Sequence, residues 1–288
     1  MTRAAFQDKF FGIMRWVVIA GLVVATLFPF YYMLLLSVKP IDNLLLDPGR
    51  IWVSANEFTV DSYRSVLTSV ENGGQGFLLM LRNSALVSIG AVILTLLVAI
   101  PGAYAVSRLR FTGQRKVSAL FLGVYLFPAT LLAVPLFVIF AKAGLQGSLI
   151  GLIIVYIAQT VPVAIYMLRS YFTTVPISIE EAAALDGCSR YQIVRRVVLP
   201  LAAPSVMATG LYVFMIAWNE FLFALLFLAA EPSHWTVSLG LQQLANGVEV
   251  PKTVLMAGSV VLTLPVVLMF YGAERLLTEG LTSGADKS

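Results

Sequence analysis

Six long apolar runs constrain the fold of this 288-residue chain more than any other feature. A helix needs roughly 20 apolar residues to cross about 30 Å of hydrocarbon, and inside lipid it must satisfy its backbone polar groups internally. The sequence therefore predicts an all-α membrane protein that forms a single domain over residues 1–288. We expect its six transmembrane helices at about residues 16–38, 84–107, 117–141, 147–168, 201–228 and 253–273.

Composition agrees with this class and excludes an ordinary soluble domain. Hydrophobic residues make up 59% of the chain and charged residues 12%, whereas roughly a quarter of the residues in soluble domains are charged. The first apolar run is longer than the core of a secretory signal, which has roughly 7–15 residues. No small-residue cleavage site precedes the Lys39-Pro40 pair at its end, so we expect this run to be retained as a helix.

Prolines lie within the second to sixth predicted spans, for example Pro101, Pro128 and Pro162. Proline removes a backbone hydrogen bond, and neighbouring helices or trapped water must satisfy the carbonyl that is freed. The prolines therefore favour helices that pack together in a bundle over helices that each stand alone in lipid.

Lys and Arg are distributed unequally between the two sides that six spans create. Of the 19 basic residues, 13 fall in the amino-terminal arm, the second-to-third and fourth-to-fifth connections and the tail; six fall on the opposite side. Basic residues favour the cytoplasm, so both termini and loop 173–200 should be cytoplasmic, while loop 39–82, with a short helix over 60–67, should lie outside. The net charge of +4 follows from this bias, and no basic, aromatic surface indicates nucleic-acid binding.

The cytoplasmic loop contains explicit helix boundaries. Ser178 followed by Glu181 matches a capping box, which satisfies free amides at a helix start. Gly187 provides a stop at which left-handed backbone costs little, and Ser189 with Gln192 repeats the start signal. The pattern predicts two short helices joined at a glycine and lying outside the bilayer.

The first of these helices presents a small face suited to close contact with a partner. Its alanines at 182–184 add little bulk, so a groove of another protein could close around the backbone. Charges that could orient such a partner stand beside them: Glu180, Glu181 and Asp186. The alternative is an amphipathic helix resting on lipid headgroups, for which Arg195-Arg196 would be equally natural. Physical chemistry alone leaves both interpretations open.

Spacing within the loop resembles the "EAA" loop of bacterial ABC importer permeases. Glu181-Ala182-Ala183 is followed by three residues, Gly187, nine residues and Val197-Val198-Leu199-Pro200; only Val197 departs from the pattern, where the family has Ile. Further segments resemble the smaller, six-helix permease of the maltose-type carbohydrate transporter family. These segments are residues 37–40, 58–63, 218–221 and 280–285.

This resemblance implies the type I ABC importer permease fold and a bacterial inner (plasma) membrane location. It implies a second, different permease subunit, two cytoplasmic ATPase subunits and an extracytoplasmic sugar-binding protein as partners, with ATP and Mg held by the ATPases. It also implies alternating access driven by ATP hydrolysis. The coupling role carries over onto Glu181, Ala182, Ala183 and Gly187, and the neighbouring charges of Glu180 and Asp186 belong to the same candidate site.

Catalytic and metal chemistry is not indicated in this chain. A single cysteine, Cys188, excludes an internal disulfide and a multi-cysteine metal site. The one histidine, His234, stands beside Trp235 and is expected to be a surface residue. No Gly-rich phosphate loop occurs in the sequence, so ATP hydrolysis is expected in partner subunits. We expect no catalytic residue, no metal site and no cofactor here.

Glu220 is the one carboxylate well inside a predicted span. A charge within the membrane is expensive and suggests a pathway or a buried partner. At 1.5 Å per residue it lies about 24 Å along the helix from Pro204, in the outer part of the bilayer. Glu220, Asn219 and Trp218 are therefore candidates for the substrate pathway, with a structural hydrogen bond between helices as the alternative for Glu220.

Two other functional classes remain to be weighed. An ion-coupled secondary transporter of small polar solutes could use Glu220 as its ion or proton site, but the six spans show no internal duplication and the EAA spacing argues against it. A structural or regulatory membrane protein is not excluded by composition. The sequence does not identify the transported sugar.

Overall fold

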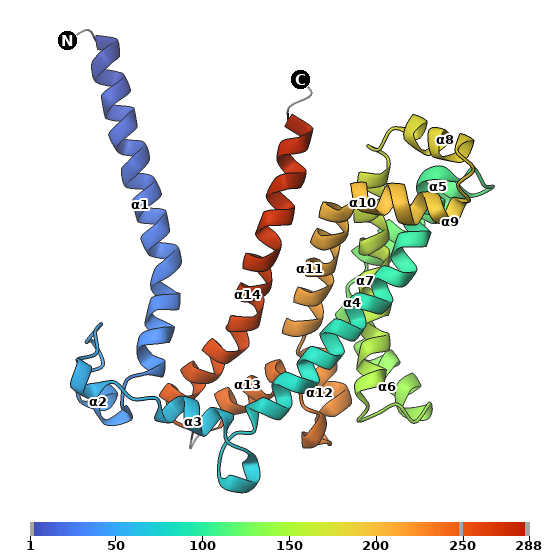
Figure 1. Ribbon diagram of the computed structural model, residues 1–288. Helices are drawn as coiled ribbons and strands as arrows, with labels where there is room; N and C mark the ends of the chain where they lie inside the picture. Colours follow the sequence, from blue (N-terminus) through green and yellow to red (C-terminus); the bar gives the residue numbers. More distant parts are fainter. Residues whose placement is uncertain (1–2, 248–249, 286–288) are drawn as a thin grey trace. The chain divides into compact units, whose positions relative to one another are not determined.

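A computed structural model describes residues 3–247 and 250–285, with side chains described at most positions between 11 and 274 (Figure 1). All regular secondary structure in this part of the chain is helical. The chain divides into two compact units: Met1–Phe77 with Gln243–Thr263, and Leu78–Gln242 with Leu264–Ser288. Helices α13 (Val237–Asn246) and α14 (Lys252–Ala285) contribute residues to both units.

The first unit begins with a long apolar helix, α1 (Arg3–Ser37), which is followed by short helices. These are α2 (Ile41–Leu46), the 3-10 turns η1 (Ala55–Glu57) and η2 (Val70–Asn72), and α3 (Asp61–Leu67). Helix α3 confirms the short helix predicted over residues 60–67. Gly73 ends η2 in the left-handed region, with φ of 79°, as its turn-forming sequence requires.

Two segments that carry the family resemblance contact each other in the first unit. The hydroxyl oxygens of Ser37 and Tyr63 lie 2.7 Å apart. The amide of Thr59 donates to the carbonyl of Val38 over 3.0 Å. These bonds fasten the start of α3 to the end of α1, so both segments have a structural role in the loop that follows α1.

Polar contacts also order the loop between α2 and η1. Lys39 is 1% exposed, and its Nζ donates to the carbonyl of Asp47 over 2.9 Å. Glu57 accepts from the amide of Ser54 (3.1 Å) and from Arg50 (2.9 Å). These two bonds hold the pKa of the Glu57 carboxyl below its ordinary value. The carboxylate therefore stays ionised, and keeps its bonds, under mildly acidic conditions.

The second unit contains most of the helices. In chain order they are α4 (Phe77–Arg108, all but its first residue), α5 (Gln114–Leu126), η3 (Ala129–Leu132), α6 (Ala133–Lys142), α7 (Leu149–Phe172), α8 (Ile177–Leu185), α9 (Arg190–Ile193), the π-helix η4 (Val194–Val198), α10 (Leu199–Leu201), α11 (Ala203–Asn219), α12 (Leu222–Leu228) and the 3-10 turn η5 (Pro232–His234).

Helix α7 lies at the centre of this unit and packs against α5, α11 and α12. It also approaches α4 closely, because a Cβ added at Gly90 would meet Ile153 Cδ1 at 3.2 Å. The hydroxyls of Thr95 and Thr160 pair over 2.8 Å in the same interface. Small residues and hydroxyl pairs of this kind bring helices together within membranes, so α4 and α7 form the frame on which the other helices are placed.

The membrane-spanning character of the chain is evident in its helices. Among the described residues, four are long and apolar enough to cross a bilayer: Phe11–Ser37, Phe77–Arg108, Leu149–Phe172 and Lys252–Glu274. Two further stretches qualify only as bent pairs: Ala119–Leu126 with Ala129–Lys142, and Arg190–Leu201 with Ala203–Asn219. Four to six spans fit this arrangement, and the number six stays a prediction.

The third predicted span, residues 117–141, is interrupted in the structure. Helix α5 ends at Leu126, and both Phe127 and Pro128 have extended backbone, with ψ of 127° and 112°. Proline has no amide to donate and drives the residue before it out of the helical region. Pro128 therefore divides this span between α5 and α6.

The fifth predicted span, residues 201–228, is divided as well. Helix α11 ends at Asn219, Glu220 has extended backbone with ψ of 131°, and α12 begins at Leu222. The sequence is apolar on both sides of this break, and neither Gly nor Pro marks it. The break therefore depends on contacts that Glu220 makes elsewhere in the unit.

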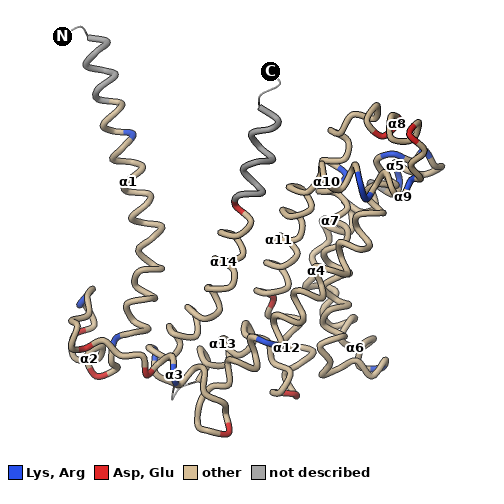
Figure 2. Tube along the Cα trace, viewed as in Figure 1, with Lys and Arg blue, Asp and Glu red and all other residues tan. Residues whose placement is uncertain are grey.

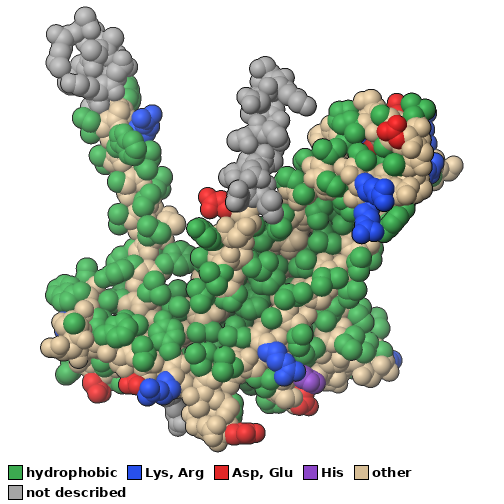
Figure 3. All heavy atoms as spheres, viewed as in Figure 1, with side chains coloured by type: hydrophobic (Ala, Val, Ile, Leu, Met, Phe, Trp, Pro, Cys, Tyr) green, Lys and Arg blue, Asp and Glu red, His purple; other side chains and the backbone are tan. Residues whose placement is uncertain are grey.

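Charged side chains gather near helix ends, and apolar side chains cover the helices between those ends. Within the second unit, Lys and Arg gather where α5 and α9 meet the end of α4 (Figure 2). Hydrophobic side chains cover most of the visible surface between the helix ends (Figure 3). An exterior this apolar would be unusual in water and suits contact with lipid or with other membrane subunits.

Candidate functional site

The candidate coupling helix of the predicted hairpin is α8, and it begins earlier than predicted. Pro176 is its N-cap, and no side chain caps it. Ser178 therefore lies in the first turn, and its predicted capping box with Glu181 is wrong. Proline fixes its own φ near the helical value and has no amide to satisfy, which makes it a suitable residue for a helix start.

Helix α8 ends just before Gly187, as predicted. Gly187 has φ of 85°, and its amide donates to the carbonyl of Ala184 over 3.0 Å. The amide of Cys188 reaches the carbonyl of Ala183 over 3.0 Å. This pair of bonds is a Schellman motif, which satisfies carbonyls left free at a helix end.

The second helical stretch of the hairpin starts where the sequence predicts. Ser189 and Gln192 form a reciprocal capping box, with the Ser189 amide 2.7 Å from Gln192 Oε1. The stretch continues through η4 and α10, and it bends by 80° from α11 near Ala202. The hydroxyl of Tyr171 donates to the carbonyl of Leu201 over 2.9 Å at this bend. Residues 190–201 thus run nearly perpendicular to α11.

The inner face of α8 is fastened to the end of α4 by a buried ion pair. Arg108 Nε lies 2.6 Å from Glu180 Oε1, and the two side chains are 8% and 10% exposed. Arg108 also donates to the carbonyl of Val175 over 2.7 Å, and the hydroxyl of Tyr104 donates to Glu180 Oε2 over 2.9 Å. Charge-assisted bonds of this length are strong and directional, so they fix the orientation of α8.

The outer face of α8 carries the other candidate residues. Glu181, Ala182 and Asp186 are exposed, as are Gly187 and Ala184, and Leu185 is 91% exposed. Ala183 differs from its neighbours because it is half-buried and packs against the subunit's own hydrophobic core. Of the predicted coupling residues, Glu180 and Ala183 therefore face the permease itself, and the remainder face away from it.

Sequence reasoning did not find Tyr104 and Arg108. Arg108 is one of the 13 basic residues that the sequence assigns to the same side as the termini, and 72 positions separate it from Glu180. The signal available was its place at the end of an apolar run, opposite a loop that holds three acids. To identify Glu180 as the partner of Arg108, one must know how each helix is rotated about its own axis.

The substrate-pathway candidates lie at the break between α11 and α12. The Glu220 carboxylate accepts from the hydroxyl of Tyr156 (2.7 Å) and from the amides of Phe223 (2.9 Å) and Ala224 (3.2 Å). Its carbonyl accepts from the hydroxyl of Ser238 over 2.7 Å. The carboxylate thus caps the start of α12 and ties it to α7, which corresponds to the structural hydrogen bond weighed for this residue.

Trp218 and Asn219 do not share this arrangement. Trp218 is 2% exposed, and its ring stacks on Phe214 with centroids 5.2 Å apart. Asn219 is exposed, and its side-chain amide donates to the carbonyl of Met215 on its own helix over 2.9 Å. Of the three candidates, Asn219 is exposed, Glu220 is half-buried and Trp218 is buried.

Metal-binding clusters are not found among the described residues. No cluster of three or more His, Cys, Asp or Glu side chains occurs there. The ring of His234 bonds through Nδ1 to the carbonyl of Gly147 over 2.5 Å, which gives this histidine a structural contact. The polar side chains described above, Glu180 with Arg108 and Glu220 with Tyr156, hold helices together.

Comparison with known proteins agrees with this arrangement. Residues 91–282 match the family described as "Binding-protein-dependent transport system inner membrane component". The chain is 38% identical to an Escherichia coli protein, "Inner membrane ABC transporter permease protein YcjP", over 93% of this chain and 94% of that protein.

Two further similarities extend over nearly the whole chain. The "Trehalose/maltose transport system permease protein MalG" of Thermococcus litoralis is 34% identical over 92% of this chain and 93% of its own length. A subunit in the crystal structure of a bacterial ABC transporter that imports the acidic polysaccharide alginate has the same fold. Its TM-score is 0.79 at 23% identity, over 96% of this chain and 98% of that one. The chain therefore belongs to the family of inner membrane components of binding-protein-dependent transport systems.

Proposed function

We propose that this chain is the transmembrane permease subunit of a binding-protein-dependent ABC importer for carbohydrate. The support for carbohydrate is the set of sequence segments that resemble carbohydrate permeases, together with the relative named for trehalose and maltose transport. In this proposal the chain itself holds no cofactor. ATP and Mg bind to two partner ATPase subunits, and ATP hydrolysis by these subunits drives alternating access.

One observation carries the proposal, namely the two-sided character of α8. Its inner face is locked to α4 through Glu180 and Arg108, while Ala182 and Leu185 on the outer face are exposed. A helix that only rested on headgroups would direct its apolar face to lipid and would need no buried ion pair. A helix that transmits force needs a rigid attachment on one side and a docking surface on the other. We infer that the outer face of α8 docks into an ATPase.

The proposal also assigns a second, different permease as partner. Between Phe11 and Leu34, apolar side chains on α1 stand exposed, including Trp16 (65%), Leu22 (63%) and Val24 (65%). Lipid or a neighbouring membrane subunit must cover them. An extracytoplasmic sugar-binding protein delivers the solute to the outer side of this pair of permeases.

Within the pathway we assign direct solute contact to Asn219. Trp218 and Glu220 hold the turn that presents it, because the first is buried and the second has all its carboxylate oxygens bonded. The competing proposal of an ion-coupled transporter needs Glu220 to exchange protons or ions during transport. A carboxylate that accepts three hydrogen bonds and caps a helix is poorly placed for that exchange.

Substitution on the outer face of α8 tests the docking. Ala182→Trp adds bulk to the exposed face, and the anchored inner face prevents α8 from rolling away. We expect the variant to insert and to pair with its partner permease, but to lose the ATPase subunits or to hydrolyse ATP without sugar uptake. Thr112→Trp is the matched control, because Thr112 is exposed in the loop that follows α4.

Co-purified ATPase and uptake are measured in the same membranes. Wild-type levels of both in Ala182→Trp would contradict docking through α8. Uptake that persists without ATPase subunits and stops when the ion gradient is dissipated would instead support the ion-coupled transporter. Ala183→Trp does not discriminate between these outcomes, because Ala183 packs within the permease.

A further inference from the structure

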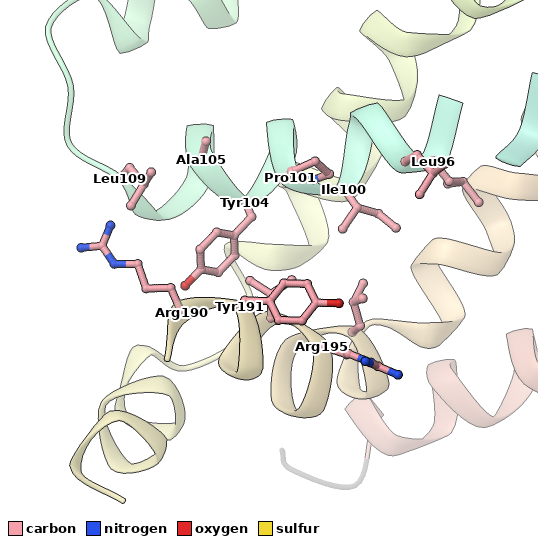
Figure 4. Close-up of a pocket in the computed structure, with 12 residues that line it drawn as sticks. Leu96, Ile100, Pro101, Tyr104, Ala105, Leu109, Arg190, Tyr191 and Arg195 are labelled. Carbon is pink, nitrogen blue, oxygen red and sulfur yellow. The ribbon is translucent and has the colours of Figure 1, made fainter. Parts of the chain in front are cut away.

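An apolar groove of about 580 Å³ lies in the second unit, between the end of α4 and the stretch 190–201 (Figure 4). Each helix contributes one face to it. The apolar walls are formed by Leu96, Ile100 and Ala105 of α4, by Leu109 directly after this helix, and by Val194 and Leu199 of the facing stretch. Neither the coupling face of α8 nor the Glu220 region contributes to this groove.

The rim of the groove is basic and aromatic. Arg190 and Arg195 line it, and Figure 4 shows them at its two ends, with Tyr191 between them. No Asp or Glu lines the groove, and no ion pair among the described residues involves either arginine. Tyr191 is 70% exposed. The groove therefore combines an apolar interior with two positive charges that can receive an anion.

The position of the groove suits the inner surface of the membrane. Because the stretch 190–201 bends by 80° from α11, it runs close to the membrane plane if α11 crosses the bilayer. Arg and Tyr are typical of that interface on the cytoplasmic side. The groove extends from Leu96 in α4 to Leu109, the residue after that helix.

We propose that this groove binds an acidic phospholipid of the inner leaflet. An acyl chain lies against Ile100 and Val194. The side chains of Arg190 and Arg195 point toward opposite ends of the groove (Figure 4), so one of them contacts the phosphate and the other adds to the positive potential that attracts an acidic headgroup.

The proposal rests on the membrane placement in the proposed function and is independent of the transported solute. It is tested on the complete transporter in nanodiscs of equal parts phosphatidylcholine and phosphatidylglycerol, followed by mass spectrometry of the lipids that stay bound after detergent extraction. We expect phosphatidylglycerol to be retained preferentially. Each arginine removed should lower that preference about fivefold, which makes Arg190→Gln/Arg195→Gln the informative variant. Arg110→Gln/Arg196→Gln is its matched control, because both residues are exposed and neither lines the groove.

A second variant changes the groove without changing charge. Ala105→Trp should fill it and lower retention of phosphatidylglycerol, and an excess of inorganic phosphate should not displace the lipid, because the apolar walls hold its acyl chain. Equal retention by all variants would overturn the proposal. Complete disulfide crosslinking between Leu97→Cys and a cysteine introduced into the second permease would also overturn the proposal, because it would show that protein covers the groove. ATP-driven uptake in the same nanodiscs tests the proposed function separately.

Discussion

At the scale of single residues, buried polar groups decide how the hairpin that begins with α8 is held. Arg108 and Glu180 are nearly excluded from solvent, and each makes a second bond, to Val175 and Tyr104 respectively. Removing one member of such a pair leaves a buried charge without compensation and costs roughly 3–5 kcal/mol, whereas replacing both by apolar side chains can be nearly neutral. The pair is therefore a sensitive test of whether α8 needs a fixed orientation.

We expect Glu180→Leu to lower both the Tm of the purified transporter and sugar uptake, because Arg108 is left unpaired. The double variant Arg108→Met/Glu180→Leu should recover a substantial part of the Tm, since no uncompensated charge remains. Arg110→Gln, at an exposed neighbouring position, should behave as wild type. Strictly additive losses in the double variant would show that the two residues act independently.

Glu220 gives a second prediction, which separates a structural role from a role in the pathway. In Glu220→Gln one oxygen becomes a donor, so it cannot satisfy Tyr156, Phe223 and Ala224 together, and the anionic cap of α12 is lost. We expect a reduced yield of assembled complex and an unchanged KM in the fraction that assembles. Asn219→Ala should show the reverse, with normal yield and raised KM. A normal yield with altered KM in Glu220→Gln would place its carboxylate in the pathway.

The identities of these residues could be predicted, but not their partners. Glu220 was recognisable as an intramembrane charge and Glu180 as part of the coupling loop, because both signals are local in sequence. Their partners, Tyr156 and Arg108, lie 64 and 72 positions away. Such pairs depend on how far each helix is rotated toward its neighbour. For the same reason, the sequence does not reveal that Ala183 faces inward while the alanines beside it are exposed.

At the scale of elements, signals carried by the backbone were the more reliable ones. Gly187 was predicted as the stop of α8 because only glycine enters the left-handed region without cost, and its φ is 85°. The capping box at Ser189 was predicted for a similarly local reason. The helix start predicted at Ser178 was wrong because Pro176, two residues earlier, offers an equally good helix start. Where two local signals compete within one turn, the sequence does not decide between them.

Breaks within apolar stretches follow a different rule. Pro128 carries a recognisable signal for the interruption between α5 and α6, since it has no amide. The interruption between α11 and α12 has no such mark. At this break the Glu220 carboxylate accepts from the free amides of Phe223 and Ala224 and from Tyr156, and Ser238 donates to the Glu220 carbonyl, so the polar groups that the break exposes are all bonded. Hydropathy alone joins the two helices into one span.

At the scale of the whole molecule, hydropathy and charge bias together predict a topology. The 13 basic residues assigned to one side include those at the ends of α4 and α9, where Lys and Arg gather in the second unit (Figure 2). A bilayer orients such a chain with its basic connections in the cytoplasm. This topology places the termini and α8 inside and the loop that contains α2 and α3 outside.

Cysteine labelling tests that topology, provided that the reporter positions are exposed. Cys188 is unsuitable because it is half-buried, so its failure to react would not report sidedness. In a Cys188→Ser background, Leu46→Cys (Leu46 is 85% exposed) should react with a membrane-impermeant maleimide in right-side-out membranes. Thr112→Cys, in an exposed loop after α4, should react only after the membranes are permeabilised. If Thr112→Cys alone were labelled in sealed membranes, the topology would be the opposite of the predicted one. Helix α8 would then lie outside the compartment that contains ATP, which would exclude coupling through this hairpin.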